Sequence, residues 1–183
     1  MNKKIIAFTK KWEGGLSRDT SDSASDFPCP TPFAGKTGWH TNKGVTYKAW
    51  TAHFGTQNDD RFFEMNDEDW ALVAMSSYWR AMRCDEVVEP INIVLFAWSW
   101  GSGKVGATKL LQRTLGVTAD GVFGSQTMKA LNEYIGTYGR KEAFDKLCDA
   151  RANFYKQIAV GKNEKFLKGW LNRLNDFRKT FKP

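Results

Sequence analysis

The residue in this sequence with the clearest chemical potential is Glu13, in the run Trp12-Glu13-Gly14-Gly15. Apolar side chains at Ile5, Phe8 and Trp12 recur at helical spacing before it, and a pair of glycines is a common stop signal for a helix. We therefore expect Glu13 in the last turn of a short helix. The C-terminal end of a helix carries partial negative charge, which disfavours an ionised carboxylate. A general acid that cleaves a glycosidic bond has to keep its proton, so Glu13 is a candidate for that role.

A long polar stretch, Leu16 to Lys43, follows the glycines and is rich in Ser, Thr, Asp, Pro and Gly. It has no sustained hydrophobic period, so we expect a loop, and a loop of this length in a compact domain is usually functional or disordered. Acid-catalysed glycoside hydrolysis commonly uses a second carboxylate, for which Asp19 and Asp22 on this loop are candidates. The competing interpretation is that acids on such a loop are simply solvated.

The elements that must position these residues are predicted to be helices. Thr46 is expected to cap one helix and Gly55 to end it, and Asn66 or Asp67 is expected to start another. The helix from Ile91 is apolar on nearly all sides, so we expect it to be central and buried, with a break at Gly101-Ser102-Gly103. The predicted helices span 47–54, 67–78, 91–100, 105–115, 125–131, 140–158 and 166–181. The predicted class is all-α, with two lobes around a cleft, Glu13 at its bottom, and at most a small hairpin in the long loop.

Composition limits the partners that the chain can have. The 183 residues include 27 basic and 20 acidic ones, and a net charge of +7 favours an anionic partner such as the bacterial cell wall or nucleic acid. No helix-turn-helix with an exposed basic face is evident, so nucleic acid is the less favoured partner. No apolar run approaches the roughly 20 residues that span a bilayer, and we expect no membrane insertion.

Cysteine and histidine usage argues against cross-links and metal sites. Cys29, Cys84 and Cys148 are odd in number and widely spaced, so we expect free thiols and a reducing compartment. Two histidines without an HExxH pattern predict no metal site, and no motif indicates a cofactor. The apolar run from Ile5 to Phe8 is too short for a signal peptide, so we expect synthesis in the cytoplasm without a recognisable export signal.

Three stretches together carry a family resemblance. The first is Glu13-Gly14-Gly15 with Asp19, Asp22 and Thr41-Asn42-Lys43-Gly44-Val45-Thr46. The second is Tyr78-Trp79 with the segment 96–103, and the third runs from Leu110-Leu111-Gln112 through Asp120-Gly121-Val122-Phe123-Gly124. They resemble the Glu-Gly-Gly N-acetylmuramidases of glycoside hydrolase family 108, which include phage endolysins and secretion-activator proteins. The third stretch is similar to the peptidoglycan-binding region of that family. The chain departs from the family pattern at Leu16, usually Tyr, and at Ala97 and Gly101, often Asp and Asn.

The resemblance implies a lysozyme-like enzyme that cleaves the β-1,4 bond between N-acetylmuramic acid and N-acetylglucosamine. Glu13 would be the general acid and Asp22 the candidate second catalytic residue. Residues 1–87 would form the muramidase region, and residues 88–183 a peptidoglycan-binding region packed with it as one compact unit. The implied partner is bacterial peptidoglycan, and the implied protein is a monomer that acts at the cell wall. The candidate substrate-binding residues are Asp19, Trp39, Asn42, Thr46, Tyr78 and Trp79.

Two other functions remain open at this point, a wall-binding protein and a basic helical nucleic-acid binder, of which the second is the less favoured. A protein of this kind could hold the cell wall without cutting it and take part in secretion. The Asp120-Gly121 and Phe123-Gly124 turns could be purely structural, because they join two predicted helices whose leucines would pack together.

Overall fold

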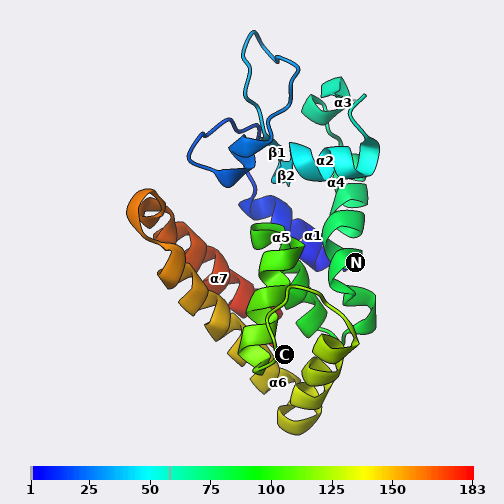
Figure 1. Cartoon of the computed structure of the whole chain (residues 1–183), viewed down its shortest axis with the longest axis vertical. Helices are drawn as coiled ribbons and strands as arrows, with labels where there is room; N and C mark the ends of the chain where they lie inside the picture. The colour runs from blue at the N-terminus through cyan, green and yellow to red at the C-terminus, as the bar shows by residue number, and fades with distance from the viewer. Residues whose placement is uncertain (1, 58) are drawn as a thin grey trace. The chain divides into compact units, whose positions relative to one another are not determined.

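The computed structural model describes residues 2–57 and 59–183, and most of their regular structure is helical. In this described part the strands are β1 (Thr41–Asn42) and β2 (Val45–Thr46), which pair as one antiparallel hairpin. The chain divides into two compact units, residues 1–77 and 78–183. The predicted all-α class is confirmed, and the hairpin lies at the end of the long loop (Figure 1). The predicted domain boundary after residue 87 stays a prediction, as does a cleft that holds Glu13.

The first unit begins with α1 and ends in a π-helical turn. Its helices are α1 (Lys3–Trp12), η1 (Ser23–Asp26), α2 (Tyr47–Phe54), α3 (Asp59–Phe63), α4 (Asp67–Val73) and the start of η2 (Ala74–Trp79). The predicted caps are confirmed: the Thr46 hydroxyl accepts a hydrogen bond from the Ala49 N–H, and the Asn66 side chain accepts one from the Asp69 N–H. Gly55 ends α2 with a φ of 77°.

Aromatic rings form the core of the first unit. Trp50, Phe62 and Trp70 are almost completely buried. Phe62 presents its edge to Trp50 at 5.7 Å and to Tyr47 at 5.3 Å between ring centroids, an arrangement that aromatic pairs favour. These contacts join α2 to α3, a short helix that has too few residues to show a hydrophobic period in the sequence.

The long loop is packed onto this core at several points. Phe33 stacks on Phe63 with 4.5 Å between ring centroids, and Phe27 stacks on Tyr47 at 5.9 Å. Cys29, which lies in this polar loop, is only 2% exposed, and its N–H donates to the Trp39 carbonyl. The loop therefore has a defined conformation that side chains spaced along it maintain.

The second unit is built on two long helices. Its elements are η3 (Arg80–Met82), η4 (Cys84–Glu86), α5 (Ile91–Leu115), α6 (Ser125–Ile158), η5 (Gly161–Phe166) and α7 (Leu167–Phe181). Figure 1 shows α7 running beside α6, and α5 packs against α6. Phe96 and Leu111 on α5 and Phe144 on α6 are completely buried.

The backbone leaves the helical region at one glycine inside each of the two long helices. Gly103 and Gly139 have φ values of 67° and 83°, and helix resumes immediately after each of them. The predicted break at 101–103 is therefore confirmed, with the predicted helices 91–100 and 105–115 on either side of it in α5. In α6, the gap predicted between residues 131 and 140 is helical except at Gly139. Among the described residues, no helix is long and apolar enough to cross a membrane.

Candidate active site

Glu13 stands at the point where α1 ends. Trp12 is the last helical residue, and Glu13 follows with extended backbone angles (φ −93°, ψ 140°), its N–H donating to the Lys10 carbonyl. Glu13 is thus the C-cap, one residue beyond the predicted position in the last turn. Its side chain is half-buried.

The chain after Glu13 runs beside the hairpin. The Lys43 N–H donates to the Gly15 carbonyl at 3.3 Å, and Ser17 pairs with Thr41 as an isolated antiparallel bridge. The hairpin turn itself consists of Lys43 and Gly44, with φ values of 48° and 78°. Positive φ at both central residues is the requirement of a type I′ turn, whose twist matches that of the flanking strands.

The Glu13 side chain lies directly against Gly44 in this turn. A Cβ atom built on Gly44 would be 2.3 Å from Glu13 Oε2 and 2.5 Å from its carboxyl carbon. Atoms cannot approach so closely, so any other residue at this position would displace the carboxyl group. Gly44 was absent from the predicted site, because the contact depends on where the hairpin folds relative to α1.

Side-chain hydrogen bonds hold the hairpin on the segment that contains α3 and α4. The Asn42 amide nitrogen donates to the Phe62 and Phe63 carbonyls at 2.8 and 3.1 Å, and Asn42 is only 3% exposed. The Trp70 indole N–H donates to the Lys43 carbonyl at 3.0 Å. These bonds fix the turn on α3 and α4, and with it the surface that Glu13 contacts. The predicted contact of Asn42 with substrate stays a prediction beside this structural role.

His40 ties the polar loop to the same hairpin. It is completely buried, and its ring nitrogens contact the Thr41 hydroxyl at 2.9 Å and the Asp19 carbonyl at 3.2 Å. A lone histidine in a polar loop gave no sequence signal for this role. The adjacent Thr46 hydroxyl caps α2, so the substrate contact predicted for it is likewise untested.

The two candidate carboxylates on the loop each close a local turn. The Asp19 side chain accepts from the Ser21 N–H at 2.9 Å, and the Asp22 side chain accepts from the Ala24 N–H at 2.9 Å at the start of η1. Both side chains are exposed. Their carboxylates are thus oriented by the backbone, and the catalytic role predicted for Asp22 stays a prediction.

The aromatic residues predicted to contact sugar are engaged in packing. The Trp39 indole N–H points at the Phe33 and Lys36 carbonyls (3.2 and 3.1 Å), and the Arg18 guanidinium lies over its half-buried ring. In the second unit, Tyr78 and Trp79 are 7% and 4% exposed. Their rings contact Trp100 and Phe96, respectively, and the Trp79 N–H donates to Asp85 at 2.6 Å. The substrate contacts predicted for these aromatic residues remain predictions.

The Leu-Gln and Asp-Gly-x-Phe-Gly motif of the second unit forms one hydrogen-bonded network. The buried Gln112 amide nitrogen lies within bonding distance of the Asp120 carboxylate, the Val122 carbonyl and the Thr127 hydroxyl. The Gln112 amide oxygen accepts from the Gly121 N–H at 2.9 Å. The Val122 N–H and the Gln112 amide lower the pKa of Asp120. The motif therefore holds the α5–α6 connection in place.

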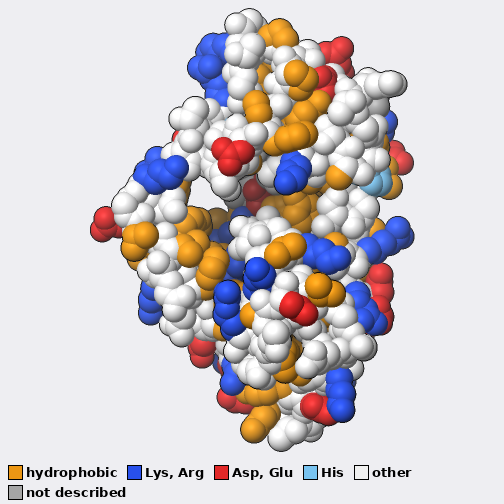
Figure 2. Space-filling model, viewed as in Figure 1, with side chains coloured by type: hydrophobic (Ala, Val, Ile, Leu, Met, Phe, Trp, Pro, Cys, Tyr) orange, Lys and Arg blue, Asp and Glu red, His pale blue; other side chains and the backbone are white. Residues whose placement is uncertain are grey.

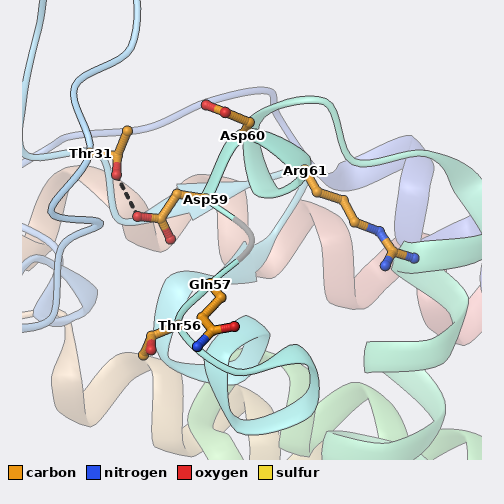
Figure 3. Close-up of a pocket in the computed structure, with 6 residues that line it drawn as sticks. All are labelled: Thr31, Thr56, Gln57, Asp59, Asp60 and Arg61. Atoms are coloured by element: carbon orange, nitrogen blue, oxygen red, sulfur yellow. Dashed lines mark hydrogen bonds between the residues drawn. The ribbon is translucent and has the colours of Figure 1, made fainter.

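A separate polar pocket of about 460 Å³ opens in the first unit. Figure 3 shows Thr31 and Asp59 on one side, with Thr56 and Gln57 on the neighbouring connection. Asp59 accepts from the Thr31 hydroxyl at 2.5 Å and from the Tyr47 hydroxyl at 2.6 Å. Burial and the nearby Asp59 carboxylate raise the pKa of Tyr47, so its proton stays in this network.

The residues that the structure describes contain no group of three or more His, Cys, Asp or Glu side chains placed to hold a metal ion. Cys29, Cys84 and Cys148 are free and buried, and burial raises the pKa of Cys148 to about 12. The chemistry available around Glu13 is therefore that of a carboxyl group held against backbone, with hydroxyl and carboxylate groups on the adjoining loop.

Comparison with known proteins decides the family. The model of the glycosyl hydrolase 108 family matches residues 6–103, more than half of the chain. The chain belongs to glycosyl hydrolase family 108. A second family model, described as a predicted peptidoglycan domain, matches residues 106–175. The resemblance seen in the sequence is confirmed, and the protein is a glycoside hydrolase of the muramidase type that acts on peptidoglycan.

The fold is shared with a solved structure of SagA from Brucella abortus. The two chains superpose with a TM-score of 0.73 at 24% identity, over 96% of this chain and 90% of SagA. This likeness confirms the predicted lysozyme-like helical fold. No curated protein sequence matches the chain.

Proposed function

We propose that this family 108 protein is an N-acetylmuramidase with Glu13 as its general acid. The bond it cleaves is the β-1,4 linkage between N-acetylmuramic acid and N-acetylglucosamine. The observation that carries the proposal is the contact between the Glu13 carboxyl group and Gly44. The end of α1 supports this carboxyl group from one side, and a hairpin bonded to α3 and α4 fixes the glycine. A proton donor has to be held in one orientation to act in the transition state.

In the proposed reaction, Glu13 gives its proton to the glycosidic oxygen while the bond from that oxygen to C1 of N-acetylmuramic acid breaks. Positive charge develops on C1 and the ring oxygen. Water then adds to C1 and loses a proton to a base, which leaves a new reducing end on N-acetylmuramic acid. The leaving N-acetylglucosamine keeps the proton that Glu13 supplied, so atoms and charge balance.

A second group has to stabilise the sugar cation or activate the water, and Asp22 is our candidate. Its carboxylate is exposed and oriented by the Ala24 N–H, on the loop that leaves Glu13. If no carboxylate activates the water, the alternative is that the Thr46 hydroxyl next to the turn positions it. We retain Asp19, Trp39, Asn42, Tyr78 and Trp79 as proposed substrate contacts.

The two glycines after Glu13 give further support. A Cβ atom on Gly14 or on Gly15 would have no heavy atom within 4 Å, and neither residue is among those with positive φ. Packing within the described chain therefore does not require glycine at either position. A polymer that passes close to this backbone would require it, because a side chain there would stand between the polymer and Glu13.

The test of the proposed bond is the identity of the new reducing end. Purified peptidoglycan sacculi are digested, the products are reduced with borohydride, and the reduced sugar is identified. We expect reduced muramic acid. Reduced glucosamine would assign cleavage to the other glycosidic bond, and a 1,6-anhydro product would indicate a transglycosylase. Binding to sacculi with no release of fragments would favour the alternative, a wall-binding protein involved in secretion.

A further inference from the structure

The two units of the chain carry very different charge. Residues 1–77 contain 9 basic and 10 acidic side chains, a net charge of −1, whereas residues 78–183 contain 18 and 10, a net charge of +8. The positive charge of the protein therefore belongs to the second unit. A unit with concentrated charge of one sign attracts a polymer of the opposite sign, and this attraction weakens as the salt concentration rises.

Within the second unit, one run of mostly positive charge lies where α6 connects to α7. We call residues 154–170 the α6–α7 tip. Between positions 156 and 168 it carries four lysines and a single acid, Glu164. The lysines are Lys156, Lys162, Lys165 and Lys168, and all are exposed. In the described part of the chain none of them forms an ion pair, whereas Lys129 and Lys141 pair with Glu133 and Asp145.

A stack of aromatic rings underlies these lysines. Trp170 lies between Tyr155 and Phe166, with ring centroids 5.3 and 5.8 Å apart and ring planes tilted by 26° in both pairs. The stack joins the end of α6 to η5 and α7. Figure 2 shows hydrophobic side chains gathered on the face of the α6–α7 connection, with basic side chains beside them.

Cations close both ends of the stack. The buried Arg151 guanidinium lies 4.7 Å from the Tyr155 ring centroid and donates to the Ser102 hydroxyl, and the Lys165 ammonium lies 4.8 Å from the Phe166 centroid. We take the stack as a rigid base that carries the exposed lysines, Lys165 among them. A rigid base lowers the entropy lost when a partner binds.

We propose that the α6–α7 tip is a docking surface for the carboxylates of the peptidoglycan stem peptides. Peptidoglycan repeats these carboxylates along each strand, so several can contact the lysines at once and a weak individual contact gains from multivalency. The inference rests on the proposed function only for the identity of the polymer. It assigns the tip the role of holding the strand while Glu13 performs the chemistry.

The experiment measures binding without digestion. The full chain carrying Glu13→Gln is pelleted with purified sacculi that are free of other wall polymers, over a range of concentrations at 50 mM salt. Three proteins are compared: this parent, a tip variant and a charge-matched control. The tip variant carries K156Q, K162Q, K165Q and K168Q, and the control carries K104Q, K129Q, K141Q and K179Q, also exposed lysines of the second unit. Melting temperatures confirm that both are folded.

We expect the tip variant to bind about tenfold or more weakly than the parent, since each lost ion pair removes a fraction of a kcal/mol and four are lost together. The affinity of the control variant for sacculi should stay within about threefold of the parent's affinity. Converting the wall carboxylates to neutral amides should weaken the parent to the level of the tip variant, and 300 mM salt should do the same.

Equal weakening in both variants would overturn the proposal, since net charge rather than the tip would then govern binding. So would parent binding that survives carboxylate blocking, or binding to duplex DNA as tight as to sacculi and equally dependent on the tip. A second measurement distinguishes the tip proposal from the proposed hydrolase activity. It follows hydrolysis of short soluble glycan fragments by proteins in which Glu13 is restored. We expect the tip variant to cut these fragments as the wild type does, and a wild type that cuts nothing would reject only the hydrolase.

Discussion

Glu13 and Gly44 are far apart in the sequence, yet the Glu13 carboxyl group lies directly against Gly44. Local pattern was enough to predict that Glu13 lies at a helix end, because a helical stripe followed by paired glycines marks that end. The cap at Thr46 was equally local. The contact with Gly44 could not be predicted, because it depends on the packing of a hairpin whose anchors lie in α3 and α4.

Gly44→Ala should abolish most activity. The substitution forces a Cβ into the Glu13 carboxyl group and places alanine at a φ of 78°. We expect a stability loss of about 1–2 kcal/mol from the backbone term and at least a tenfold loss of activity. Gly55→Ala is the matched control, since Gly55 has a φ of 77° but open space around it. It should lose at least as much stability, because a ψ of −176° puts Gly55 in a region that is essentially restricted to glycine, and it should keep its activity. Equal activity in the two variants would refute the role of the contact.

Gly15→Ala should keep the stability of the protein and lower its activity. Nothing in the described chain lies near a Cβ at this position, so the melting temperature should be unchanged or slightly higher, because alanine reduces the freedom of the unfolded chain. The kcat/KM on sacculi should fall by about tenfold or more if the glycan strand passes over this backbone. Unchanged kcat/KM would show that the strand takes another path.

At the scale of elements, the Gln112 network makes the second unit depend on one side chain. Gln112→Ala removes the groups that bind the Gly121 N–H, the Asp120 carboxylate and the Val122 carbonyl. We expect a loss of about 2–4 kcal/mol in the free energy of unfolding, measured by denaturant titration. Gln126→Ala, an exposed change at the start of α6, should stay within about 0.5 kcal/mol. Similar values for both would contradict a structural network.

The same network predicts that the stability of the folded protein depends on pH through Asp120. The Val122 N–H and the Gln112 amide lower the pKa of Asp120 in the folded state. Asp120 therefore contributes stability above its unfolded pKa of about 4, and this contribution is lost as pH falls through the lower folded pKa. Asp120→Asn should be less stable than wild type at pH 7, and the difference in melting temperature should shrink steadily towards pH 2. A constant difference would exclude this carboxylate as the source.

Helix starts and breaks were predictable where a single local residue marks them. Thr46 and Asn66 mark starts through side-chain hydrogen bonds to residues three positions on, and Gly103 lies in the predicted break at 101–103. The helical segment 132–138 was missed, because its side chains are mostly exposed and show no hydrophobic period. The polar loop showed no period, because spaced aromatic residues such as Phe27 and Phe33 order it.

At the scale of the whole molecule, charge and motif pointed to the same partner. The net charge of +7 indicated an anionic partner, which left both the cell wall and nucleic acid as candidates. The motifs indicated the cell wall. The family match confirmed peptidoglycan. What composition alone could not reveal is that the positive charge belongs to residues 78–183, since that conclusion needs the division of the chain into units.

The most direct test of the central claim is the Glu13→Gln protein. Glutamine keeps the shape of the side chain that lies against Gly44 but cannot donate the proton. Release of reducing ends from purified sacculi should fall by a factor of about 10²–10⁴, with the melting temperature close to that of the wild type. A folded Glu13→Gln protein that releases reducing ends at the wild-type rate would contradict the assignment of Glu13 as the general acid.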